Sequence, residues 1–268
     1  MDIRISSWAE LTERLYADSW KPQLRRFRSN YAFRGMADER DDLTTTLRRL
    51  GPSSVRHEAH LLRNFRKYAH RDAALGDSVW NWLTLAQHHG LPTRLLDWTF
   101  SPFVALHFAT ANIEDFHLDG VVWCVDYVKT HQLLPAPLRK VLDEEQADVF
   151  TTEILERAAP SLPEFDALGK EHQFAVFLDP PSLDERIVNQ FALLSFMSSA
   201  KADMDHWLDQ HPELAHRLII PNTLKWEIRD KLDQANVTER VLFPGLDGLS
   251  RWLKRYYSPR QGEEEMEQ

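Results

Sequence analysis

The chain has 268 residues, of which 43 % are hydrophobic and 27 % are charged. A chain of this length and composition can bury a large apolar core, which excludes both a disulfide-stabilised miniprotein and a wholly disordered chain. The 41 acidic and 32 basic residues give a formal net charge of −9. This balance argues against sequence-blind binding of nucleic acid over the whole surface, but it leaves room for a local basic groove.

The single cysteine, Cys124, excludes an internal disulfide framework and a zinc site built from several cysteines. It fits a reducing compartment. The first 15 residues lack the apolar core of a secretory signal, and no stretch reaches the roughly 18 consecutive apolar residues of a membrane span. We therefore expect a soluble cytoplasmic protein with no membrane partner and no bound metal.

The N-terminal half is predicted to hold helices around one early strand. Ser7 and Glu10 form a capping box before apolar residues at helical spacing, which predicts a first helix up to Leu15. Ser101 and Pro102 are typical of a helix start, because serine caps the N-terminus and proline fits the first turn. The other elements predicted in this half are a strand over residues 31–35 and helices over 61–69 and 80–89.

The middle of the chain is predicted to contribute most of the strands. In chain order, the pattern predicts strands over 121–125, 173–178 and 191–196, a strand over 218–220, a helix from Asn222 to about Ala235, and a last helix after 243–245. A turn at 179–181 separates the second and third of these strands. The result is an α+β fold with a central, mostly antiparallel sheet and helices near both ends of the chain.

No internal repeat or linker divides the chain, so residues 1–256 are expected to form a single domain. The last residues, 257–268, are predicted to be a disordered acidic tail. Near the N-terminus lies a basic run that favours a solvated face, with a phosphate or nucleic-acid patch as the alternative. This run consists of Lys21, Arg25, Arg26 and Arg28.

Three segments concentrate polar residues among apolar ones. They are Phe33-Arg34-Gly35, the stretch 87–98 that continues into 101–109, and the stretch 186–191. Together they resemble the FRG-domain family, which is named for the Phe-Arg-Gly triplet. The closing stretch 242–249 also looks like that family, so the resemblance runs from about residue 25 to about residue 255.

A second resemblance concerns chemistry. The triplet at 33–35, followed by Thr99-Phe100-Ser101 and a helix reading Val-Ala-x-x-Phe-Ala, is similar to the first two motifs of the Arg-Ser-Glu class of ADP-ribosyltransferases. This resemblance implies the fold of that class, with NAD as substrate. The sequence departs at the third motif, where Gln190 stands in place of the expected glutamate and supplies no negative charge.

The resemblance implies a role for each candidate residue. Arg34 would clamp the phosphate or ribose part of NAD, Ser101 with Thr99 would shape the nicotinamide–ribose site, and Gln190 would take the third position. His88 and Asp97 would complete the pocket. The candidates for contacting NAD are Phe33, Gly35, Gln87, Arg94, Asp97, Trp98 and Thr99, with Phe33, Trp98 and Tyr31 offering an aromatic wall for the nicotinamide ring.

Structural alternatives accompany several of these residues. Arg34 could instead pair with a buried carboxylate such as Asp97, and Arg94 lies three residues from Asp97, which is the spacing of a helical ion pair. His88 and His89 are adjacent, so on a helix they point about 100° apart and cannot share one metal. We expect one of them to be buried and the other to be available for acid–base chemistry.

The leading functional prediction is an NAD-dependent ADP-ribosyltransferase-like enzyme whose acceptor is a protein, a nucleic acid or water. Such proteins in bacteria and phages often act as toxins or defence effectors, which implies a neutralising partner protein. One alternative is a non-catalytic module that binds a nucleotide or protein on the same fold. Another is a nucleic-acid-processing toxin that works without NAD and uses His88 and His89 as general acid and base.

Overall fold

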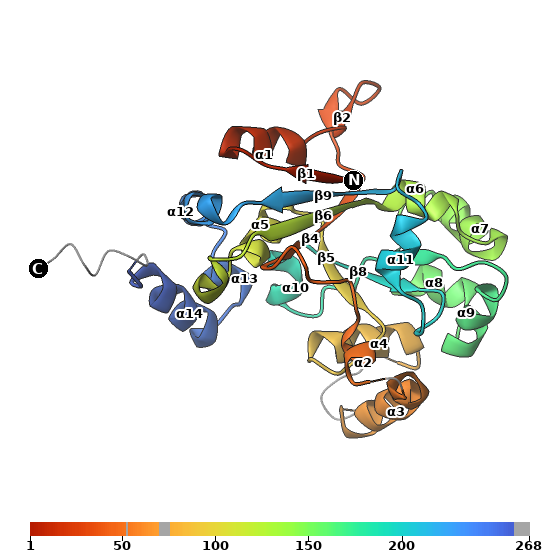
Figure 1. Cartoon of the computed structure of the whole chain (residues 1–268). Coiled ribbons are helices and arrows are strands. Elements are labelled where there is room, and N and C mark those ends of the chain that lie inside the picture. The colour runs from red at the N-terminus through yellow and green to blue at the C-terminus, as the bar shows by residue number, and fades with distance from the viewer. Residues whose placement is uncertain (52, 70–75, 260–268) are drawn as a thin grey trace, which may run out of the picture.

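The computed structural model describes residues 1–51, 53–69 and 76–259 (Figure 1). Most of the predicted acidic tail, residues 260–268, lies outside the described residues. Within the described ranges, no helix combines the length and the apolar character needed to cross a bilayer.

A seven-stranded sheet organises the molecule, in the order β1-β9-β6-β4-β5-β8-β7. Only β1 and β9 pair in parallel, so the predicted mostly antiparallel sheet is confirmed. A separate two-stranded hairpin, β2–β3, precedes β4. The strands are β1 (Asp2–Arg4), β2 (Trp20–Lys21), β3 (Arg26–Phe27), β4 (Tyr31–Met36), β5 (Leu96–Thr99), β6 (Gly120–Asp126), β7 (Ala175–Leu178), β8 (Ala192–Met197) and β9 (Ala215–Ile220).

The helices surround this sheet on both faces. They are α1 (Trp8–Leu15), α2 (Thr46–Arg49), α3 (Glu58–Ala69), α4 (Val79–His88), α5 (Pro102–Ala109), α6 (Tyr127–Gln132), α7 (Ala136–Glu145), α8 (Thr152–Ala158), α9 (Leu162–Leu168), α10 (Glu185–Asn189), α11 (Met204–Asp209), α12 (Lys225–Gln234), α13 (Glu239–Leu242) and α14 (Leu246–Tyr256). The predicted helices at both ends are confirmed, whereas α6 to α9 occupy a middle stretch in which the sequence pattern predicts no element.

Two details of the sequence prediction are wrong. Asn222 does not cap an α-helix, because a short 3-10 turn over Asn222–Leu224 comes first and α12 begins at Lys225. The connection between β7 and β8 is more than the turn at 179–181, since it also contains α10. This helix carries Arg186 and leads into Gln190.

Side chains alternate between the two faces of the sheet and so build separate apolar clusters. On one face, Trp98 and Trp123 pack with Trp207 of α11. The opposite face holds two clusters. One joins β4, β6 and β9 to α1, α5 and α12, and the other joins β7 and β8 to α3, α4 and α7 to α9. These two clusters lie on either side of a gap between α4 and α5, over strands β4, β5 and β8.

Candidate functional site

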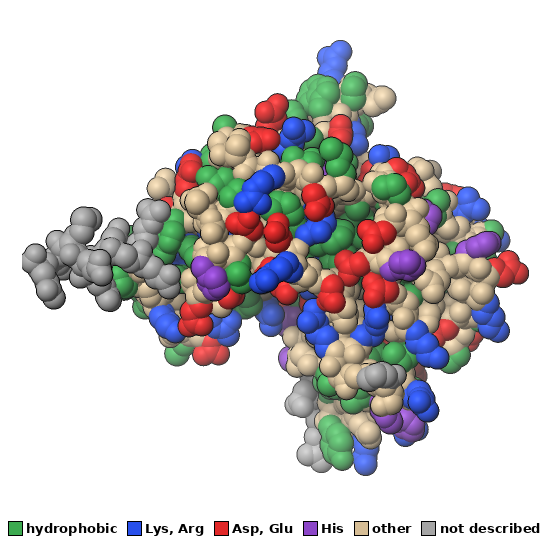
Figure 2. All heavy atoms as spheres, viewed as in Figure 1, with side chains coloured by type: hydrophobic (Ala, Val, Ile, Leu, Met, Phe, Trp, Pro, Cys, Tyr) green, Lys and Arg blue, Asp and Glu red, His purple; other side chains and the backbone are tan. Residues whose placement is uncertain are grey.

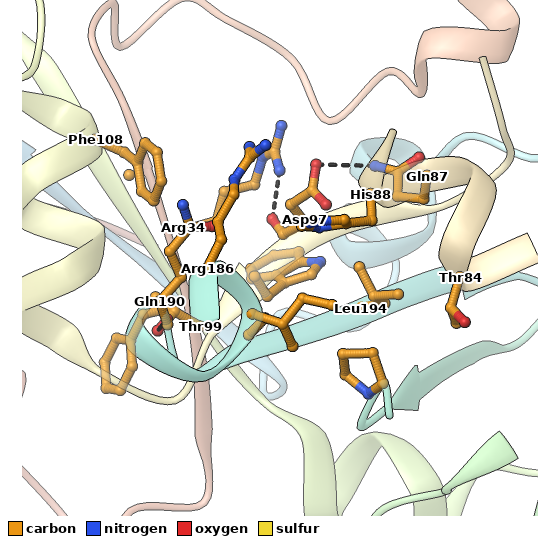
Figure 3. Close-up of a pocket in the computed structure, with 16 residues that line it drawn as sticks. Arg34, Thr84, Gln87, His88, Asp97, Thr99, Phe108, Arg186, Gln190 and Leu194 are labelled. Carbon is orange, nitrogen blue, oxygen red and sulfur yellow. Dashed lines mark hydrogen bonds between the residues drawn. The ribbon is translucent and has the colours of Figure 1, made fainter. Parts of the chain in front are cut away.

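A cavity of about 250 Å³ occupies this gap (Figure 3). Strands β4, β5 and β8 form its base, while α4, α5, α10 and the turn after β7 supply the remaining walls. Sixteen residues line it: Phe33, Arg34, Gly35, Thr84, Gln87, His88, Asp97, Trp98, Thr99, Phe108, Pro180, Arg186, Ile187, Gln190, Ala192 and Leu194. The structure thus gathers the sequence-predicted site residues around one cavity, except Ser101, Arg94, Tyr31 and His89.

The cavity exists because β4 and β5 diverge. Their only residue pair in the sheet is Phe33 with Thr99, whereas β5 continues to pair with β8 along its whole length. Beyond that pair, the guanidinium of Arg34 bridges the two strands, because its Nη1 donates a hydrogen bond to the carbonyl oxygen of Asp97 (Figure 3). The contact involves the Asp97 backbone, so the predicted alternative of a pairing with its carboxylate is wrong in that detail.

Arg34 keeps unused hydrogen-bonding capacity inside the protein. Its Nε atom is buried without a hydrogen-bond partner. Burial lowers the pKa of Arg34, and the nearby charge of Asp97 partly offsets that shift. Within the described ranges, no carboxylate lies within ion-pair distance of its guanidinium. An arginine held this way favours an incoming anion such as a phosphate.

A second arginine, Arg186 of α10, lines the same cavity as Arg34 (Figure 3). It stacks on the ring of Phe243, with its guanidinium carbon 5.1 Å from the ring centroid. In the described part of the chain it forms no ion pair. Arg186 belongs to the polar stretch 186–191, but the sequence pattern predicts no role for it. Arg186 and Gln190 are four residues apart, which is the spacing of neighbours on one side of a helix. This spacing is the sequence signal that could have predicted that both lie on the same side of α10.

The acidic side of the cavity is held by a chain of hydrogen bonds. Asp97 accepts a hydrogen bond from Gln87, over 2.9 Å between Oδ2 and Nε2 (Figure 3). Gln87 in turn accepts a hydrogen bond from the hydroxyl of Thr93 through its Oε1. The bond from Thr93 fixes which end of the Gln87 amide faces Asp97. Among the described residues that line the cavity, Asp97 is the only carboxylate. It is therefore the group best placed to stabilise a developing positive charge.

His88 lies at the mouth of the cavity with its side chain largely buried. It donates a hydrogen bond from Nε2 to Oδ2 of Asp184 over 2.5 Å. Asp184 also caps α10 by accepting a hydrogen bond from the backbone N–H of Ile187. Burial raises the pKa of Asp184, but the bonds from Ile187 and His88 outweigh that effect and lower it overall. His89 is exposed and lies outside the cavity, so only one of the two histidines faces it.

Thr99 connects the base of the cavity to the start of β8. Its hydroxyl donates to the carbonyl oxygen of Gln190 over 2.7 Å and accepts from the backbone N–H of Ser101 over 2.9 Å. The side chain of Gln190 is directed elsewhere, since its Nε2 donates to the carbonyl oxygen of Leu242. Ser101 caps α5 by accepting a hydrogen bond from Val104 and does not line the cavity. Of the two hydroxyl residues predicted for the site, only Thr99 therefore lines the cavity.

Arg94 corrects a second prediction. Its side chain is buried and forms a bidentate ion pair with Glu58 of α3, with Nη2 2.6 Å from Oε2, and a further ion pair with Asp166 of α9. These carboxylates raise the pKa of Arg94 despite its burial. Arg94 is therefore neither a helical partner of Asp97 nor available to a ligand. Tyr31 also lies outside the cavity and packs edge-on against His216.

A second hollow, of about 440 Å³, adjoins the cavity and shares His88 and Arg186 with it. His89, Phe243 and Arg251 also line it. The two hollows together offer more length than the cavity alone. No group of three or more histidine, cysteine, aspartate or glutamate side chains in the described ranges is close enough to hold a metal ion.

The family model of the FRG domain matches residues 29–117. No curated protein and no solved structure matches the chain. The match covers β4 through α5 and leaves out the predicted C-terminal stretch 242–249. It includes Arg34, Gln87, Asp97 and Thr99, whereas Arg186 and Gln190 come from outside it. Residues 29–117 are accordingly an FRG domain, and this domain supplies most of the residues that line the cavity.

Proposed function

We propose that the cavity binds the nicotinamide–ribose–phosphate part of NAD and that the protein is an NAD-consuming enzyme similar to the ADP-ribosyltransferases. One observation carries the proposal: Arg34, which has no ion-pair partner in the described structure, faces a cavity whose base is β4, β5 and β8. Arg34, Thr99 and Gln190 thus come from three neighbouring strands or their ends, in the order of the Arg-Ser-Glu motifs.

The dimensions fit a ligand that extends beyond the cavity. Small-molecule sites commonly enclose about 300–1,000 Å³. The cavity alone, at about 250 Å³, suits one half of a dinucleotide, and the adjoining hollow suits the other half. Arg34 and Arg186 would then contact the pyrophosphate between the two halves, where their charges offset those of the phosphates.

The reaction we propose breaks the bond between the nicotinamide nitrogen and ribose C1′. The bonding electron pair leaves with nicotinamide, whose ring nitrogen loses its positive charge, and the ribose becomes oxocarbenium-like. A water molecule or an acceptor group then adds to C1′ and releases a proton. Asp97 takes over the electrostatic task of the missing glutamate, because Gln190 carries no charge and its amide is bound to Leu242.

The test is nicotinamide release from NAD by the purified protein, with and without cell lysate. We expect the Arg34→Ala and Asp97→Asn variants to release nicotinamide at least about 100-fold more slowly, which is the usual cost of removing a group that stabilises transition-state charge. Arg40→Ala is the matched control, because Arg40 pairs with Asp38 at the surface away from the cavity. Dependence on lysate separates transfer from hydrolysis.

Absence of nicotinamide release from the folded wild-type protein contradicts the enzymatic proposal. Tight NAD binding without release then supports the non-catalytic module. A second candidate function has its own observation, the His88–Asp184 pair at the cavity mouth, which resembles an oriented general base. Cleavage of RNA or DNA without NAD, abolished by His88→Ala, would support that candidate instead.

The proposed chemistry also fits the wider biological prediction. An enzyme that consumes NAD in the cytoplasm would be harmful to its own cell, which is consistent with a toxin or defence effector. Such a protein would need a neutralising partner. This part of the proposal rests on the resemblance to ADP-ribosyltransferases. It would be supported if bacteria that express the wild-type chain grow slowly while bacteria that express the Arg34→Ala variant grow normally.

A further inference from the structure

A short hairpin projects from the sheet before β4. It consists of residues 20–28, in which β2 and β3 pair antiparallel around a turn, and we refer to it as the arm. In Figure 1 the arm extends past α1 and away from the rest of the molecule. Figure 2 shows hydrophobic side chains on this projection and a basic group at its end. Every residue of the arm except Lys21 is exposed.

The arm differs sharply in charge from the rest of the chain. It contains four basic residues and no acidic one, so it carries +4, and because the whole chain carries −9, the remainder carries −13. The basic residues are Lys21, Arg25, Arg26 and Arg28. In the part of the chain that the structure describes, none of them forms an ion pair. Their charges are therefore available to an anionic partner.

The arm also exposes large apolar side chains. Trp20 is 49 % exposed, and Phe27 and Leu24 are each 61 % exposed. Trp20 and Phe27 face each other across the hairpin, with ring centroids 5.2 Å apart. The next pair along the hairpin is Lys21 with Arg26. Because successive side chains of a strand point to opposite faces, the aromatic pair lies on one face of this small element and the cationic pair on the other.

We propose that the arm binds single-stranded nucleic acid. Unpaired bases stack on exposed aromatic rings regardless of sequence, and neighbouring cations contact the phosphates. A double helix keeps its base faces covered, so the rings of Trp20 and Phe27 would gain little from it. An anionic bilayer would draw on the same four cations, so binding to vesicles is measured as well. The proposal is independent of NAD chemistry, since no residue of the arm lines the cavity.

The experiment measures fluorescence anisotropy of labelled 20-nucleotide oligo(dT) and oligo(rU) with the full chain over a series of salt concentrations. Each phosphate contact with a single strand contributes about −0.7 to the slope of log affinity against log salt, so four contacts predict a slope close to about −3. We expect the variant with all four basic residues of the arm replaced by alanine to lose most of this slope and at least about 30-fold in affinity at 100 mM salt. Trp20→Ala with Phe27→Ala should weaken binding about tenfold or more at every salt concentration.

A matched control removes the same charge elsewhere. Its four alanine substitutions replace the exposed residues Arg139, Lys140, Lys170 and Lys201. Oligonucleotide binding that the arm variants reduce and this control retains, with unchanged thermal midpoints, supports the proposal. Three results overturn it: no binding by the wild type, an equal loss in the control, or arm-dependent binding to phosphatidylserine vesicles but not to oligonucleotides.

Discussion

At the level of single residues, the Phe-Arg-Gly triplet divides three tasks along one strand. Phe33 is buried against Ala105 and Leu106 of α5, so it anchors β4 to that helix. Position 35 faces the same side of the sheet as Phe33, because residues two apart on a strand share a face. Its glycine, which has no side chain, leaves room there for α5. Arg34 lies between Phe33 and Gly35 and reaches the gap toward β5. The triplet thus places one guanidinium in the cavity between two residues that fix the strand against its helix.

The close packing of β4 against α5 predicts that Gly35→Ala strongly destabilises the fold. A Cβ atom at this position would lie 1.7 Å from the carbonyl oxygen of Ala105, and that atom belongs to the backbone of α5. The clash can therefore be removed only if the whole of α5 shifts. We expect the free energy of unfolding to fall by about 3 kcal/mol or more. Urea unfolding followed by circular dichroism measures this change.

Gly51→Ala is the control for the loss of glycine itself. No atom lies within 4 Å of a Cβ built there, but φ is +113°, so only backbone strain opposes the substitution. We expect a cost of about 1 kcal/mol. A Gly35→Ala variant as stable as Gly51→Ala would refute the close approach of α5.

Residue identity predicted one part of the site better than another. Gln87, Asp97 and Thr99 stood out as polar residues in an apolar stretch, and all three line the cavity. Arg94 looked equivalent in the sequence, yet its partners Glu58 and Asp166 are 36 and 72 residues away, where no local pattern reveals them. The role of Ser101 was ambiguous in the sequence, because a serine hydroxyl can either cap a helix N-terminus or contact a ligand.

At the level of elements, Arg94 joins three separate parts of the chain. It precedes β5 and forms ion pairs with the first residue of α3 and with α9. We expect Arg94→Met to lower the free energy of unfolding by about 3–5 kcal/mol, because Glu58 would remain buried without its counter-charge. Denaturant unfolding measures the loss.

The control for Arg94 is an arginine with two carboxylate partners at the surface. Arg157 pairs with Glu144 and Glu145, and all three side chains are nearly half exposed. Arg157→Met should therefore cost no more than about 1 kcal/mol. If Arg94→Met were equally mild but abolished NAD binding, Arg94 would return to the list of ligand-contacting residues.

The elements that the sequence predicted are those with a strong local pattern. α1 and α5 have hydroxyl caps, and β4, β6 and β8 are apolar strands. β5 escaped prediction because its four residues are extended mainly through pairing with β8, which lies about 95 positions later in the chain. The helices α6, α8 and α9 have only six or seven residues each, which is too few for the apolar period to be distinct.

At the level of the whole molecule, two buried histidines couple the core to pH. Burial, reinforced by the charge of Arg229, lowers the pKa of His107 to about 3. Burial lowers the pKa of His131 to about 4, and this side chain accepts a hydrogen bond from the backbone of Phe177 in β7. Both histidines are therefore neutral in the folded protein at pH 5–7.

The sign of the pH effect follows from these shifts. In the unfolded chain both histidines titrate near 6.5, so below that pH the unfolded state binds more protons and folding becomes less favourable. Their stabilising contribution is complete above about pH 6.5 and decreases as pH falls toward about 4 and 3. Each histidine contributes about 1.3 kcal/mol to the change between pH 7.0 and 5.5, so we expect the free energy of unfolding to drop by about 2.5 kcal/mol over that interval.

Urea unfolding at the two pH values tests this coupling. The variant with His107→Gln and His131→Gln should be less stable than the wild type at pH 7.0, yet it should lose about 2.5 kcal/mol less on acidification, because glutamine does not titrate. Replacement of the exposed residues His57 and His172 by glutamine should leave the pH dependence as it is in the wild type. If the wild-type protein were equally stable at pH 7.0 and 5.5, the folded core would tolerate protonated histidines. That result would contradict the lowered pKa of His107 and His131.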